Sequence, residues 1–183
     1  MDECLILIDF QNDYFQGGKM ELTDTEEAAA NAGLILNDFR KKRLPIIHIQ
    51  HISTRPGAAF FLPGTHGAEI NETVAPRDGE IVLEKNFPNS FRGTQLLEIL
   101  KEKEIKNLVI CGAMSHMCID ATVRASFDLG FSCVVVEDAC ATRDLVYKGK
   151  TIKASEVHAA FMAALSVLYS KILTTKELIE ERT

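Results

Sequence analysis

Short runs of aliphatic and β-branched residues alternate along the chain with longer stretches in which apolar residues recur at helical spacing. The first run, Leu5–Ile8, has no polar alternation, which is typical of a strand that is buried on both faces. Similar runs predict strands at 45–49, 80–84, 107–111 and 133–136, with a short edge strand at 171–173. The intervening stretches predict helices at 25–42, 93–104, 118–129 and 155–169, with a final helix near Thr175.

Repeated strand–helix–strand units in one chain imply right-handed crossovers and a mostly parallel sheet between two layers of helices. We therefore expect a three-layer α/β/α, Rossmann-like fold with about six strands in its central sheet. The 183 residues suit one domain, spanning 1–183. The segment 50–79 has clustered prolines and glycines and no clear periodicity, so it reads as a long loop, and such loops are commonly functional.

The net charge, the apolar stretches and the cysteines indicate which binding partners and which cellular compartment to expect. The net charge of −6 argues against binding to nucleic acid or to an anionic membrane. Asp2 and Glu3 follow Met1, so no signal peptide is expected, and the apolar stretch 159–169 is too short to span a membrane. Five cysteines without a CxxC pair indicate reduced thiols in a cytoplasmic protein and no structural zinc site.

Three predicted strands lead to residues with reactive side chains: Asp9, Lys85 and Cys118. Each alone has an ordinary explanation, as a turn cap, a solvated cation and a small buried side chain. At the carboxyl ends of neighbouring strands, however, they would form a nucleophilic site. The start of a helix and a nearby ammonium would lower the pKa of the thiol, and the carboxylate could accept its proton.

Three blocks of sequence carry a resemblance to a known superfamily. The blocks are 8–15 (IDFQNDYF), 84–91 (EKNFPNSF) and 112–122 (GAMSHMCIDAT). In this order they resemble the signature blocks of the isochorismatase-like cysteine hydrolases, which include nicotinamidases, carbamoylsarcosine amidohydrolases and isochorismatases. The segment 124–141 also fits, and the resemblance extends over nearly the whole chain.

The resemblance implies roles for individual residues. Asp9 matches the general base of the superfamily, Lys85 its catalytic lysine and Cys118 its nucleophile. The superfamily also places a cis peptide bond four residues before the cysteine, which here would join Ala113 and Met114. The backbone N–H groups of Met114 and Cys118 would then form the oxyanion hole for a tetrahedral intermediate.

Four residues are weaker candidates for contact with the substrate: Phe15, Gln50, Phe87 and His116. Core packing is at least as good an explanation for the two phenylalanines, and a surface loop is an equally good one for His116. Gln50 falls where isochorismatases carry a substrate-contacting glutamine. Ser90 fits a helix N-cap better than a second nucleophile.

No metal and no other cofactor is expected. Nicotinamidases hold a divalent metal through an Asp-x-His pair after the second strand, but this chain has Gln50-His51-Ile52 at that place. Gln50 is a poor substitute for a carboxylate and Ile52 cannot bind a metal. His51 and His66 remain, and two uncoupled histidines would make only a weak site.

The function that these features favour is hydrolysis of a C–N bond, amide or carbamoyl, in a small molecule through a thioester of Cys118. One alternative is an isochorismatase-type vinyl ether hydrolase, which needs the acid and not the thiol; Gln50 favours this alternative and Cys118 counts against it. Another is a non-catalytic binding protein on the same fold. We also expect a homodimer or larger homo-oligomer, because the helix at 155–169 is strongly apolar. The sequence does not name the substrate.

Overall fold

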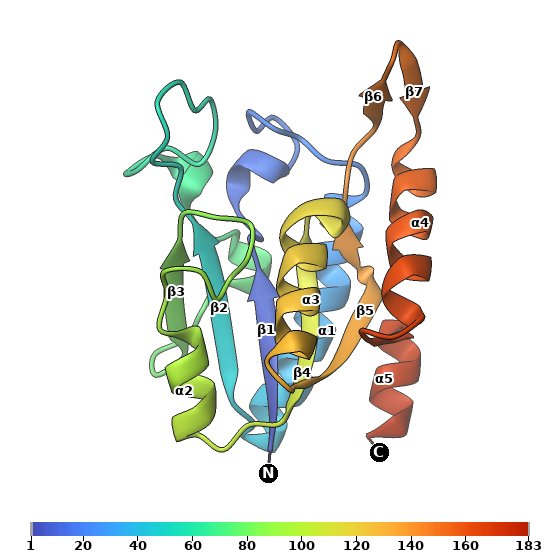
Figure 1. The fold of residues 1–183 in the computed structure, drawn as a ribbon. Coiled ribbons are helices and arrows are strands. Elements are labelled where there is room, and N and C mark those ends of the chain that lie inside the picture. The colour runs from blue at the N-terminus through green and yellow to red at the C-terminus, as the bar shows by residue number, and fades with distance from the viewer. Residues whose placement is uncertain (1, 183) are drawn as a thin grey trace.

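A computed structural model describes residues 2–182 and contains a central sheet of six parallel strands in the order β3-β2-β1-β4-β5-β8 (Figure 1). The strands are β1 (Glu3–Ile8), β2 (Ile46–His51), β3 (Ile81–Lys85), β4 (Asn107–Ala113), β5 (Ser132–Ala141) and β8 (Lys171–Leu173). The apolar run predicted as the first strand is buried in the centre of the molecule.

Helices cover both faces of this sheet. On one face lie α1 (Thr25–Lys42) and α5 (Thr175–Glu181), which contact each other. On the other face lie α2 (Leu96–Glu102), α3 (Asp120–Asp128) and α4 (Ala154–Ser166), as Figure 1 shows. Burial from both sides explains why the central strands have continuous apolar sequences. The predicted three-layer α/β fold is therefore confirmed.

The order of the strands reverses beside β1. The chain first builds β2 and β3 on one side of β1, and then returns to build β4, β5 and β8 on the other side. Ligands of such sheets bind at this switch point, outside the carboxyl ends of the strands. Here the switch point lies between β1, which Asp9 follows, and β4, which leads to Cys118.

Gly112 allows β1 and β4 to come close at this point. Its φ of +133° favours glycine, and a Cβ atom added there would lie 2.0 Å from the carbonyl oxygen of Ile8. Asp9, the residue directly after β1, has a φ of 56° and so turns the chain out of the sheet. One of these features is at Asp9, a predicted catalytic residue, and the other is on the neighbouring strand that leads to Cys118.

The predicted helix boundaries were wrong in two places that matter for the site. A single π-helical turn, Ser115–Ile119, precedes α3, so Cys118 is not in the first turn of an α-helix. The helix expected at 93–104 is the shorter α2, and Ser90 is not its N-cap. Instead Ser90 is buried, and its hydroxyl lies 2.9 Å from Thr122 Oγ1 in α3.

Other differences concern the carboxyl edge of the sheet. β2 continues to His51, and the long loop after it contains two short 3₁₀ helices, His66–Ala68 and Glu72–Val74; another follows β1 at Asn12–Tyr14. After β5 a hairpin of β6 (Leu145–Tyr147) and β7 (Lys150–Ile152), which was not predicted, projects beyond the body of the molecule (Figure 1). Within residues 2–182, no helix has the length and apolar character needed to cross a bilayer.

Candidate active site

The three residues predicted as a catalytic triad come together at the switch point. Lys85, the last residue of β3, donates hydrogen bonds from Nζ to Asp9 Oδ2 at 2.8 Å and to Cys118 Sγ at 3.2 Å. The side chains of Asp9 and Lys85 are fully buried, and Cys118 is 5% exposed. The site is therefore a buried ion pair in contact with a thiol.

His51, for which no role was predicted from the sequence, is a fourth member of this cluster. Its Nδ1 atom lies 3.0 Å from Lys85 Nζ and accepts the third hydrogen bond of the ammonium, which can only donate. Parallel pairing of β2 with β3 places His51 directly beside Lys85. The predicted strand at 45–49 continues for two more residues, to His51. The register between strands cannot be read from one sequence, so the contact with Lys85 could not be predicted.

The ammonium of Lys85 stays charged in this environment. Burial alone would lower its pKa, but the neighbouring Asp9 carboxylate and Cys118 sulfur raise the pKa above its ordinary value. Three hydrogen bonds to three different side chains also use every proton of the ammonium. Lys85 therefore acts as a fixed positive centre.

The predicted lowering of the Cys118 pKa is wrong. Burial raises the pKa of the thiol well above its ordinary value, and the negative charge of Asp9 raises it further, while Lys85 offsets only part of the effect. The π-helical turn also removes the expected place in the first turn of an α-helix. Burial and the charge of Asp9 thus favour the neutral thiol of Cys118 over the thiolate.

The Asp9 carboxylate lies close to this thiol and has one oxygen free of hydrogen bonds within residues 2–182. Lys85 holds Oδ2, whereas Oδ1 is buried and has no hydrogen-bond partner among residues 2–182. An oxygen of this carboxylate, the sulfur of Cys118 and a ring nitrogen of His51 all lie within 4.8 Å of one another. A buried carboxylate oxygen without a donor is costly, and a carboxylate this close to a thiol can accept its proton.

The backbone between β4 and Cys118 has the geometry of a tight turn. The peptide bond between Ala113 and Met114 is cis. The carbonyl oxygen of Met114 accepts hydrogen bonds from the N–H groups of Met117 at 2.9 Å and Ile119 at 3.3 Å. Neither bond uses the N–H of Cys118, which lies between these two donors in the sequence.

Two of the four weaker candidates have structural roles in the protein. Phe15 is buried in the hydrophobic core. Gln50 donates from Nε2 to the carbonyl oxygen of Ala68 at 2.8 Å, which holds the long loop against the end of β2. Within residues 2–182, the Gln50 side chain makes no hydrogen bond to Asp9, Lys85 or Cys118.

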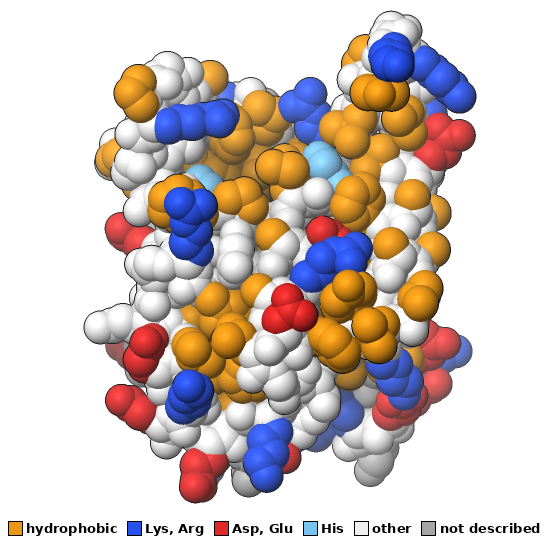
Figure 2. All heavy atoms as spheres, viewed as in Figure 1, with side chains coloured by type: hydrophobic (Ala, Val, Ile, Leu, Met, Phe, Trp, Pro, Cys, Tyr) orange, Lys and Arg blue, Asp and Glu red, His pale blue; other side chains and the backbone are white. Residues whose placement is uncertain are grey.

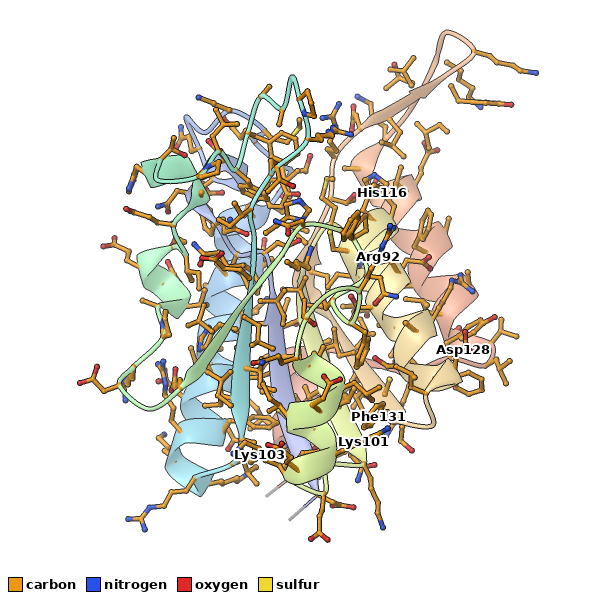
Figure 3. The ribbon with its side chains drawn as sticks, turned by 60° about the vertical axis from the view of Figure 1, so that its left-hand side comes forward. Arg92, Lys101, Lys103, His116, Asp128 and Phe131 are labelled. Atoms are coloured by element: carbon orange, nitrogen blue, oxygen red, sulfur yellow. The ribbon has the colours of Figure 1, made fainter. Side chains whose placement is uncertain are left out.

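Phe87 and His116 are more accessible. Phe87 is 38% exposed, with the guanidinium of Arg92 3.7 Å above its ring. His116 is half-buried, and its Nδ1 lies 2.6 Å from Thr142 Oγ1. Figure 3 shows His116 near the carboxyl ends of the strands, far from Lys101 at the opposite end. In Figure 2 this edge is hollowed beside the projecting hairpin and carries hydrophobic and histidine side chains.

The cluster contains a possible set of metal ligands with a positive charge at its centre. Asp9, His51 and Cys118 could each offer one atom to a metal, but the Lys85 ammonium is bonded to all three. A divalent cation there would meet strong repulsion from this ammonium. The imidazole of His66 is strongly exposed and pairs with Glu69 at 2.8 Å, so it does not complete a nicotinamidase-type site.

Comparison with known proteins places the chain in a family. The family model described as the isochorismatase domain matches residues 3–177. The isochorismatase family protein YddQ of Bacillus subtilis is 49% identical and covers 98% of this chain and 100% of its own length. A crystal structure from Oleispira antarctica, described as an isochorismatase hydrolase, has a TM-score of 0.94, with 50% identity over 98% of this chain and 96% of its own.

A more distant relative has a name that specifies its reaction. N-carbamoylsarcosine amidase of an Arthrobacter species is 33% identical over 79 residues, which are 43% of this chain and 30% of that protein. The match of the family model over nearly the whole chain, and the strong similarity to YddQ, identify the family. The chain belongs to the isochorismatase family of hydrolases.

Proposed function

We propose that this protein is a cysteine hydrolase that cleaves an amide or carbamoyl C–N bond of a small molecule through a thioester. The observation that carries the proposal is the buried Asp9 carboxylate: one of its oxygens lies within 4.8 Å of the Cys118 sulfur, Oδ1 has no hydrogen bond within residues 2–182, and Lys85 holds Oδ2. The name of the Arthrobacter amidase supports a C–N bond as the target.

In the proposed reaction, Asp9 Oδ1 takes the proton of Cys118 as the sulfur attacks the carbonyl carbon. The N–H groups of Met114 and Cys118 stabilise the oxyanion of the tetrahedral intermediate. Protonated Asp9 then gives its proton to the departing nitrogen, which leaves an acyl thioester. Water attacks the thioester, Asp9 takes a proton from that water, and Asp9 then returns this proton to the released sulfur of Cys118.

The raised pKa of Cys118 sets the order of these events. Because the thiol is neutral at rest, its proton must move to Asp9 as the bond to carbon forms. The ammonium of Lys85, at 3.2 Å from the sulfur, compensates the negative charge that develops on it. Asp9 thus acts as a general base, and Lys85 as its electrostatic partner.

The two alternatives have less support. Vinyl ether hydrolysis would not use the contact between Lys85 and Cys118, and Gln50, the residue that favoured it, donates to the carbonyl of Ala68. A non-catalytic binding protein would not need a thiol beside a buried ion pair. The substrate of the proposed reaction is a small molecule, and its identity is the object of the first experiment.

Cys118→Ala and Asp9→Asn are each expected to reduce turnover by about 1,000-fold or more, because nucleophile and base act as a unit. Ammonia release from a panel of primary amides and carbamoyl compounds measures this effect. Cys133→Ala is the matched control, because Cys133 is also buried but lies at the opposite end of the sheet. Near-normal turnover in the Cys118 variant would contradict the assignment.

Asp9→Asn should lower turnover but increase the rate of alkylation of Cys118. The carboxylate raises the pKa of the thiol, so its removal lowers that pKa and increases the thiolate fraction at a given pH. We expect faster labelling by iodoacetamide, followed by mass spectrometry of the Cys118 peptide at neutral and alkaline pH. Slower labelling would show that Asp9 favours the thiolate, against the electrostatics described here.

Hydrolysis is expected to survive dialysis against EDTA, because the Lys85 ammonium takes the central position among the possible ligands. Elemental analysis should find well under one metal per chain. Stoichiometric zinc, iron or manganese, with activity lost on chelation and restored by that metal, would revive the nicotinamidase-type mechanism.

We also propose that the chain forms a homodimer or larger assembly. Val167 and Leu168 after α4 are 83% and 61% exposed, and Val146 and Tyr147 on the β6–β7 hairpin are 71% and 65% exposed. Multi-angle light scattering should give a mass of at least twice the 20.3 kDa chain. A monomer at micromolar concentration would refute self-association.

A further inference from the structure

His51 presents one ring nitrogen to Lys85, and the other has no hydrogen-bond partner among residues 2–182. Burial and the charge of Lys85 lower the pKa of His51 to about 4, so the imidazole is neutral at neutral pH. A neutral imidazole carries one proton, and Nδ1 cannot hold it because Nδ1 accepts from the ammonium. The proton is therefore on Nε2, which makes this atom a hydrogen-bond donor.

The backbone of His51 is held in place by a single buried side chain. Gln11 Oε1 accepts from the N–H of His51 at 2.7 Å, and Gln11 Nε2 donates to the carbonyl oxygen of His51 at 2.8 Å. The aromatic ring of Phe61, with its centroid 5.9 Å from that of the imidazole, packs beside it. With Lys85 fixing Nδ1, the ring is oriented from three sides, as preorganised binding groups are.

The free donor is accessible. Among residues 2–182, Nε2 has no hydrogen-bond acceptor. It is also not among the fully buried side-chain nitrogen and oxygen atoms without a hydrogen bond, so solvent can reach it. His51 is half-buried, and one of its ring nitrogens lies within 4.8 Å of the sulfur of Cys118. A molecule that reacts with the sulfur therefore comes within reach of this ring.

We propose that His51 contacts the substrate and that its Nε2–H donates a hydrogen bond to an acceptor atom next to the scissile carbonyl. The proposal rests on the proposed function and narrows the substrate class to amides or carbamoyl compounds with a second acceptor, such as another carbonyl or a ureido oxygen. Lys85 has a second role here, because its hydrogen bond selects the donating tautomer.

The tautomer is tested by long-range ¹H–¹⁵N NMR of the full-length protein with labelled histidine. At neutral pH the His51 ring should show a protonated Nε2 and an unprotonated Nδ1. A proton on Nδ1, or a doubly protonated ring, would overturn the proposal. This readout does not depend on hydrolysis.

Contact with the substrate is tested by binding of malonamide and butyramide to the Cys118→Ala variant, since only malonamide has a second carbonyl. We expect malonamide to bind about tenfold more tightly, the worth of one hydrogen bond. In the Cys118→Ala protein, a second substitution, His51→Asn, should remove this preference, because the Asn amide reaches only as far from the backbone as Nδ1 does. Added His51→Gln, whose amide reaches the depth of Nε2, should keep most of it.

Added His66→Gln is the matched control, because this exposed histidine lies outside the cluster and its replacement should leave the preference unchanged. Equal affinity for the two amides, or a preference that survives His51→Asn, would overturn the proposal. Loss of the proposed function appears separately, as the absence of ammonia release by the wild-type protein.

Discussion

The site depends on one buried positive charge. The ammonium of Lys85 is bonded to an oxygen of Asp9, a nitrogen of His51 and the sulfur of Cys118, which come from three other segments of the chain. A buried charge is tolerated only when it is paired and hydrogen-bonded. The folded sheet must therefore bring β1, β2, β3 and the turn after β4 together at this point, and their meeting creates the chemistry.

The same burial that makes the ion pair necessary also determines how the thiol can react. Excluding water raises the pKa of Cys118, which disfavours a thiolate in the resting protein. In the proposed reaction the Asp9 carboxylate, whose Oδ1 has no hydrogen bond within residues 2–182, accepts the proton of this thiol. Gly112 contributes at the level of the backbone, because a side chain there would collide with β1 and move Asp9 away from β4.

Much of the fold could be predicted because strands buried on both faces have continuous apolar sequences and the long helix at 25–42 has a clear period. Asp9, Lys85 and Cys118 could be found because they follow such strands. His51 was missed because its position depends on the register between β2 and β3. The prediction of a lowered pKa for Cys118 was wrong because burial and the π-helical turn arise from tertiary packing, which the local sequence does not specify.

The most direct test of this account is mass spectrometry of the protein quenched in acid during turnover of an amide that it hydrolyses. The account predicts an acyl group on the peptide that contains Cys118, released by hydroxylamine and absent when Cys118→Ala is mixed with the same amide. Continued ammonia release with no acylated Cys118 peptide, or acylation at another residue, would contradict the central role given to this thiol and its buried ammonium.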